Sequence, residues 1–116
     1  MKELTRMRFS PLLLTLLCIT PFAAQANDKN DEEIHCAAYY EILSVAGDQP
    51  DMSRKQSSEA FYTFLKRAGD TPEAQDLVAQ KMVELAKEIP GKMTPENIAT
   101  FRARYDAQCS ALLKSA

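Results

Sequence analysis

The sequence predicts an all-α fold, a compact four-helix bundle-like domain in which one disulfide joins the first and last helices. Three observations support this prediction. Apolar residues recur with the 3.6-residue period of a helix in four segments, and no segment alternates with period 2 over five or more residues. After residue 26, every glycine and proline falls at a boundary between these segments. The two cysteines of this region lie in the first and the last segment.

Residues 1–26 are predicted to be a secretory signal peptide. Three basic residues come first, an apolar run over residues 11–22 follows, and Ala24 and Ala26 supply the small side chains that signal peptidase recognises. An uncleaved anchor is the alternative, but a spanning helix needs about 20 apolar residues and this run is shorter. We therefore expect cleavage after Ala26, a mature helical domain over residues 27–116, and a location in the periplasm.

The charge of the mature domain argues against nucleic acid as a partner. The whole chain has 14 basic and 16 acidic residues, and the signal peptide removes three basic residues and one acidic residue, which leaves a net charge of −4. Such a domain has no basic stripe with which to collect phosphates. No segment after Phe22 is apolar for long enough to cross a membrane, so we expect no stable membrane insertion after cleavage.

The first two helices are predicted from their caps and stripes. The first follows Asp31, a good N-cap residue, and ends at Gly47. Its apolar stripe consists of Ile34, Ala38, Ile42 and Val45, broadened by Cys36, Tyr39, Tyr40 and Leu43. The second runs from about Ser53 to Ala68 and is stopped by Gly69. Its apolar face consists of Phe61, Phe64, Leu65 and Ala68.

The last two helices both open with Thr-Pro-Glu, a capping threonine followed by proline at the first helical position. The third therefore begins at Thr71, and it is predicted to stop at Pro90-Gly91. Its apolar face consists of Ala74, Leu77, Val78, Met82, Leu85 and Ile89. The fourth begins at Thr94. Its apolar face consists of Ile98, Phe101, Tyr105, Cys109 and Leu112, so Cys109 is expected to point inward.

Cys36 and Cys109 are predicted to form a structural disulfide. Cys18 is lost with the signal peptide, and the remaining two cysteines reach an oxidising compartment. In an up-down-up-down bundle the first and last helices are antiparallel neighbours, so the start of one lies beside the end of the other. An orthogonal packing is the alternative. A reactive or metal-binding thiol pair would need a CxxC spacing or nearby histidines, and the sequence has neither.

The sequence predicts no catalytic residue, no metal site and no cofactor. His35 is the one histidine, which excludes a His pair for zinc, and no CxxCH motif for covalent haem is present. We interpret His35 as a partly exposed residue of the first turn, with pH sensing or ligand binding as the alternative. Glu59, Glu84 and Glu88 lie on polar faces beside lysines, as expected of solvated helical faces.

Two functions from different classes remain. The first is a non-enzymatic periplasmic protein that binds another envelope protein, for example an inhibitor, an immunity protein, a pilotin or a chaperone. Its candidate interaction surface consists of His35, Tyr39, Tyr40 and Tyr62, because adjacent tyrosines point about 100° apart and one of the first pair is expected to be exposed. The second is a carrier of a small apolar ligand or cofactor, ranked lower because the stripes suffice for a core without a spare cavity.

Overall fold

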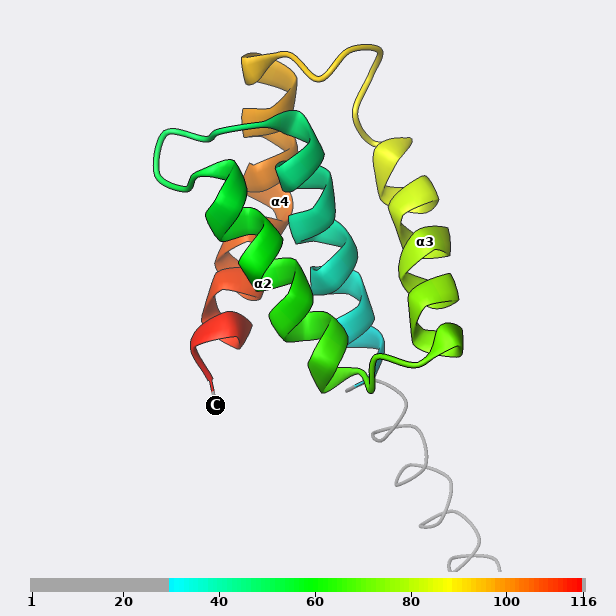
Figure 1. The fold of residues 1–116 in the computed structure, drawn as a ribbon. Helices are drawn as coiled ribbons and strands as arrows, with labels where there is room; N and C mark the ends of the chain where they lie inside the picture. The colour runs from blue at the N-terminus through cyan, green and yellow to red at the C-terminus, as the bar shows by residue number, and fades with distance from the viewer. Residues whose placement is uncertain (1–29, 116) are drawn as a thin grey trace, which may run out of the picture. The chain divides into compact units, whose positions relative to one another are not determined.

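The computed structural model describes residues 30–115, in which four helices are joined by short connections (Figure 1). The first helix spans residues 30–46. It is followed by α2 (Arg54–Arg67), α3 (Pro72–Ala86) and α4 (Pro95–Lys114). No strand occurs in this part of the chain, apart from one isolated bridge between Gln49 and Met52. The predicted all-α fold is confirmed, whereas the predicted signal peptide lies outside the described residues.

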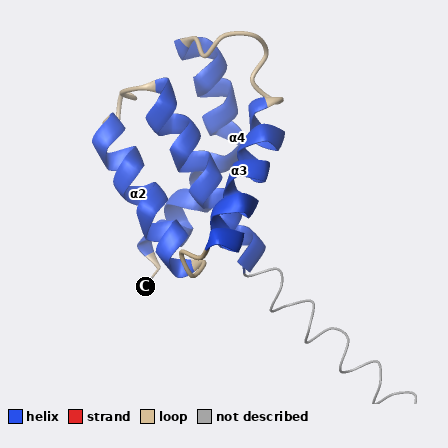
Figure 2. Ribbon diagram, turned by 45° about the vertical axis from the view of Figure 1, so that its right-hand side comes forward, coloured by secondary structure: helices blue, strands red, loops and turns tan. Residues whose placement is uncertain are grey.

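The first helix is the central element of the domain. The other three helices lie around it in both ribbon views (Figures 1 and 2). Its buried side chains cover most of its circumference: Glu33, Ile34, Cys36, Ala37, Ala38, Tyr39, Tyr40, Ile42 and Leu43. A helix that is apolar on nearly all sides must be enclosed to be stable, and this one supplies eight of the eighteen buried hydrophobic residues of the core.

The two ends of the first helix differ from the prediction in detail. Asn30 is already helical, so Asp31 lies inside the helix and is not its N-cap. The helix ends before Gly47, as predicted, and Gly47 adopts a φ of 109° that favours glycine. Val45 was expected in the buried stripe but is 62% exposed, because it lies on the solvent side of the last turn, whereas Leu43 and Ala46 on the other side pack against the core.

The predicted extent of α2 is confirmed to within one residue at each end, and both ends are capped. The Ser53 side chain accepts a hydrogen bond from the Gln56 amide, and the Gln56 side chain accepts one from the Ser53 amide, which forms a capping box. At the other end, the amides of Gly69 and Asp70 donate to the carbonyls of Lys66 and Leu65. This pattern is a Schellman motif, and it reverses the chain toward α3.

The start of α3 is confirmed, but its end and part of its apolar face are corrected. The Thr71 side chain accepts from the Ala74 amide, as predicted for a cap. The helix ends at Ala86, four residues before Pro90, and the chain continues in tighter turns because the residue before a proline is disfavoured in the helical conformation. Leu77 is 44% exposed, since α3 packs through a narrower face. That buried face consists of Ala74, Val78, Leu85 and, beyond the helix, Ile89.

The last helix, α4, is covalently tied to the first. Thr94 caps it, and Ile98, Phe101 and Cys109 are buried along the predicted face. The predicted disulfide is present, with a distance of 5.5 Å between the Cα atoms of Cys36 and Cys109, and neither cysteine has exposed surface. Within residues 30–115, no helix combines the length and hydrophobicity needed to cross a membrane.

Candidate functional site

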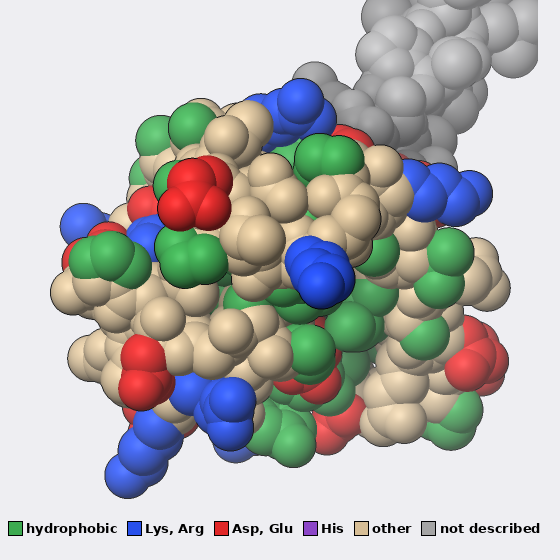
Figure 3. All heavy atoms as spheres, turned by 90° about the horizontal axis from the view of Figure 1, so that it is seen from above, with side chains coloured by type: hydrophobic (Ala, Val, Ile, Leu, Met, Phe, Trp, Pro, Cys, Tyr) green, Lys and Arg blue, Asp and Glu red, His purple; other side chains and the backbone are tan. Residues whose placement is uncertain are grey.

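A groove opens at the end of the domain where the first helix finishes and α4 begins. Its volume is about 820 Å³, and it is open to solvent on one side. It is lined by Ala46, Asp48, Gln49, Pro50, Met93, Pro95, Ile98, Ala99, Arg102, Ala103 and Asp106. Figure 3 looks onto this end of the molecule, where hydrophobic side chains lie exposed between acidic and basic ones. The groove therefore offers a mixed surface with a predominantly apolar lining.

Local hydrogen bonds fix the loop that forms one wall of the groove, residues 47–53. Gln49 and Met52 exchange two backbone hydrogen bonds, of 2.8 and 3.3 Å, around a turn that contains Pro50. The Asp48 carboxylate accepts from the Arg54 amide at 2.8 Å. Proline in a turn and a side chain bonded to the backbone both restrict the loop. This wall of the groove is consequently preformed.

The connector between α3 and α4 forms another part of the rim. The Asn97 side chain donates to the carbonyls of Pro90 and Lys92, at 3.0 and 2.9 Å. These two bonds hold the connector against the first turn of α4. As a result Met93, which is 40% exposed, lies at the edge of the groove. Methionine is a flexible apolar residue that suits contact with partners of different shape.

Beneath the groove, a polar network joins the first helix, the 47–53 loop and α4. The Tyr39 hydroxyl donates to Asp106 at 2.7 Å, and Arg102 donates to the same Asp106 oxygen at 3.1 Å. Arg102 also makes a bidentate pair with Asp51, at 2.6 and 3.0 Å. Such bidentate pairs fix geometry as well as adding energy. The Arg102 side chain is only 13% exposed, so this network is part of the groove wall.

Four groups in and around this network, on Tyr39, Tyr40, Asp51 and Arg102, stay in one protonation state near neutral pH. Burial strongly raises the pKa of the Tyr39 hydroxyl, and it raises the pKa of Tyr40 to about 12. The hydrogen bonds from Arg102 lower the pKa of Asp51, and the same contact raises the pKa of Arg102. Both tyrosines are thus neutral, and Asp51 and Arg102 are charged. These pKa shifts indicate that the four groups hold the groove in shape and do not take up or release protons near neutral pH.

A second cluster surrounds His35 on the first helix. Its ring lies 4.7 Å from that of Tyr105 in an edge-on arrangement, and the Tyr105 hydroxyl donates to Glu88 at 2.7 Å. Arg104 donates to the same carboxylate at 2.9 Å. Burial lowers the pKa of His35, and Lys81 adds to this effect while Glu88 opposes it. His35 is therefore a half-buried packing residue between the first helix and α4.

The four residues predicted to form an interaction surface do not share one exposed face, although Tyr39 and Tyr40 pack ring against ring and His35 and Tyr39 both contact Tyr105. Tyr39 and Tyr40 have 0% and 1% exposure, so the expectation that one of them faces solvent is wrong. They are buried because the first helix is enclosed on almost every side. Tyr62 is 56% exposed on α2, outside the groove lining, and His35 lies in its own cluster. The candidate surface is instead the groove.

The sequence did contain a signal for the network beneath the groove. Arg102 and Asp106 are spaced i, i+4 on α4, directly beside the apolar positions Phe101 and Tyr105. A charged pair at the border of a buried stripe is expected to be half-buried, and such pairs need partners. The contribution of Asp51 depends on the path of the loop, which the spacing of residues does not reveal.

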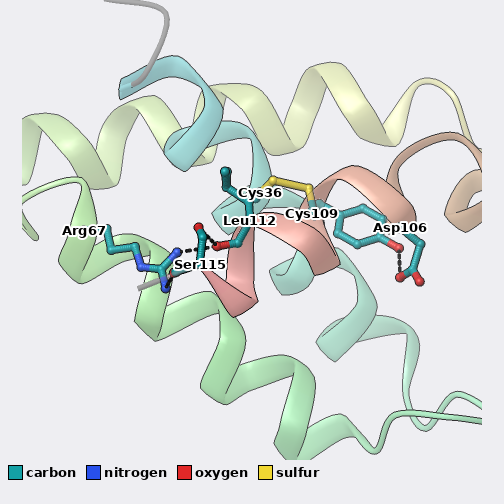
Figure 4. Close-up of a disulfide and its surroundings, with 7 residues drawn as sticks. Cys36, Arg67, Asp106, Cys109, Leu112 and Ser115 are labelled. Carbon is teal, nitrogen blue, oxygen red and sulfur yellow. Dashed lines mark hydrogen bonds between the residues drawn. A yellow bond between two sulfur atoms is a disulfide. The ribbon is translucent and has the colours of Figure 1, made fainter. Parts of the chain in front are cut away.

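The disulfide lies close to this network along the chain. Asp106 is three residues before Cys109 on α4, and Tyr39 is three residues after Cys36 on the first helix. The hydrogen bond between Asp106 and the first helix and the disulfide therefore join the same two helices one turn apart (Figure 4). Two adjacent links of this kind fix both the distance and the rotation of α4 against the first helix.

Among residues 30–115, no group of three or more His, Cys, Asp or Glu side chains is arranged to hold a metal ion. Comparison with models of protein families, with curated proteins and with solved structures gives no match. The function is accordingly argued from the geometry of the groove and its network.

Proposed function

We propose that this chain is a non-enzymatic periplasmic protein that acts by binding another protein of the cell envelope, and that the groove is its binding surface. Export is supported by the signal-like pattern of residues 1–26 and by the disulfide, since disulfides persist in oxidising compartments. An inhibitor, an immunity protein, a pilotin or a chaperone would each act in this way.

The observation that carries the proposal is the preformed groove. Its lining is mostly apolar, and its walls are held by the 47–53 loop, the Asn97 bonds and the Tyr39, Asp106 and Arg102 network. A site that is already rigid loses little conformational entropy when a partner binds. The groove therefore suits a protein segment that inserts an apolar side chain between the loop and α4.

A small apolar ligand is the second candidate. The volume of about 820 Å³ falls in the range of small-ligand pockets. Such pockets, however, enclose most of the ligand surface, whereas this groove is open and has charged residues in its lining. A protein segment, which keeps one side in solvent, fits the groove better.

The test uses substitutions that fill the groove without touching the core. Ala103 is exposed on α4 and lines the groove, so Ala103→Trp blocks it. Ala79 is exposed in the middle of α3 and lies outside the lining, so Ala79→Trp is the matched control. Circular dichroism and a thermal melt check that both variants fold.

Each variant and the wild type are used as bait in periplasmic extract, and bound proteins are quantified by mass spectrometry. The expected result is an envelope protein that binds the wild type and Ala79→Trp but is lost with Ala103→Trp. If every captured protein binds Ala103→Trp as well as the wild type, the groove is not the binding surface. Recovery of a small molecule instead of a protein would support the carrier function.

A further inference from the structure

The lining of the groove contains more acidic than basic residues. Asp48 and Asp106 are in the lining, and Asp51 is paired with Arg102, the one basic residue of the lining. The lining therefore holds two carboxylates and one guanidinium, and the guanidinium is itself paired with a third carboxylate outside the lining. Arg54, beside Gly47, and Lys92, beside Met93 on the connector, lie at the edge of the groove and outside the lining, so the acidic excess belongs to the lining itself.

The one guanidinium of the lining, on Arg102, is already paired with carboxylates of the protein itself. Both terminal nitrogens of Arg102 donate to the carboxylates of Asp51 and Asp106, and its Nε atom is buried. An acidic partner would have to compete with these two carboxylates for the guanidinium. Breaking a well-formed bidentate pair is costly, so the groove offers little to an anion.

The carboxylates of Asp48 and Asp106, in contrast, can each accept a further hydrogen bond. Asp48 accepts one hydrogen bond from the Arg54 amide through Oδ1, and Asp106 accepts from Tyr39 and Arg102 through Oδ1. Within residues 30–115, the Oδ2 atom of each receives no hydrogen bond. A carboxylate oxygen at the rim of an apolar groove is a favourable partner for a lysine or arginine that enters with an apolar neighbour.

We infer that the groove recognises a basic apolar segment, in which an apolar side chain fills the space over Ala99 and Ala103 and a flanking lysine or arginine pairs with Asp48 or Asp106. This inference rests on the proposed function and names the chemistry of the partner. The two alanines leave room for a large side chain, and the stem of a lysine or arginine can itself cover apolar surface. An acidic or neutral segment could fill the space over the two alanines, but it could not form the ion pair with an aspartate of the lining.

The probe is a displayed library of random dodecapeptides, panned on immobilised full-length mature protein with its disulfide intact. Bound peptides are then sorted by whether they also bind Ala103→Trp, which identifies those that need the groove. The expected groove-dependent peptides pair a large apolar residue with a nearby lysine or arginine. Their affinity should fall with rising salt, because exposed charge pairs are screened.

The charge is tested on one selected peptide by fluorescence anisotropy. Asp48→Lys places a like charge at the rim and should weaken binding roughly tenfold or more. Asp48→Asn keeps the acceptor for the Arg54 amide and should weaken binding about two- to fivefold. Asp76→Lys changes the net charge by the same amount on an exposed position of α3, and it should change affinity less than about twofold.

The outcomes separate this inference from the proposed function. Groove-dependent peptides that are neutral or acidic would overturn the inference and leave the groove as a binding surface. Equal effects of Asp48→Lys and Asp76→Lys would do the same. A library that yields no groove-dependent peptide would overturn both, because the groove would then bind no segment at all.

Discussion

The Asp106 carboxylate accepts a 2.7 Å hydrogen bond from the hydroxyl of Tyr39, a side chain with no exposed surface. This bond connects the centre of the domain to the groove, since Tyr39 belongs to the enclosed first helix and Asp106 lines the groove. Any partner that contacts Asp106 therefore contacts a group whose position is set by the core.

Removing the Tyr39 hydroxyl should destabilise the fold. Tyr39→Phe keeps the packing of the ring but deletes a hydrogen bond to a charged acceptor, so we expect a loss of about 1–2 kcal/mol in the free energy of unfolding. Urea unfolding at neutral pH measures this loss. The control is Tyr62→Phe, at a 56% exposed ring, which should stay within about 0.5 kcal/mol of the wild type. Equal effects of the two variants would contradict this role of Tyr39.

Breaking the disulfide between Cys36 and Cys109 should lower the stability of the fold by more than Tyr39→Phe does. The bond joins residues 73 positions apart, and a loop of this length is expected to contribute roughly 2–4 kcal/mol, which corresponds to about 10 °C or more in melting temperature. Cys36→Ala, Cys109→Ala and the double variant should resemble one another, because each opens the same loop. Thermal melts with and without reductant test this. A melt that does not move on reduction would show that the clamp is not structural.

His35 should make stability depend on pH in the weakly acidic range. Burial lowers its folded-state pKa below the value of about 6.5 in the unfolded chain, so the unfolded state binds the proton more readily. The contribution of His35 to the free energy of unfolding is therefore lost as pH falls from above 6.5 toward the lowered folded-state pKa. The carboxyls of Asp51 and Glu88, whose pKa values are also lowered, lose their contributions only at more acidic pH.

The variant His35→Gln should fold and bind its partner at neutral pH, while the fall in stability just below pH 6.5 is reduced. Melting temperatures measured in steps between neutral pH and about pH 5 compare it with the wild type. An unchanged slope would assign the pH dependence to other groups. Loss of partner binding in a folded variant would instead make His35 part of the interaction surface.

The mature chain should begin at Asn27, because the small residues Ala24 and Ala26 occupy the positions that signal peptidase reads. The measurement is the intact mass of protein purified from the periplasm of cells that express the full sequence. A mass that corresponds to another first residue, or to the uncleaved chain, would refute this cleavage site.

Most of the predicted helix boundaries hold because they depend on short-range chemistry, whereas the start of the first helix and the end of α3 differ. Ser53, Thr71 and Thr94 cap their helices as their side chains dictate, and Gly47 and Gly69 end two of them in conformations that favour glycine. The pairing of Cys36 with Cys109 was predicted because they are the two cysteines that follow the predicted signal peptide, and an up-down-up-down bundle places the start of the first helix beside the end of the last.

The burial of individual side chains was harder to predict, because it depends on how many neighbours a helix has. A stripe with a helical period was expected for the first helix, which is in fact enclosed, and this error led to the expectation that Tyr39 or Tyr40 faces solvent. The nearly unbroken apolar run of residues 36–40 could have indicated enclosure. The groove required the path of the 47–53 loop and of the connector before α4, which local patterns do not specify.

The disulfide also makes the domain a covalent ring that runs from Cys36 through α2 and α3 to Cys109. The exposed connections at Pro50 and Gly91, where a protease is most able to cut, both lie within this ring. A single cut at either one leaves two pieces of chain that cannot diffuse apart until the bond is reduced. In a compartment that contains proteases, a nicked molecule can thus keep its parts together and close again around the first helix.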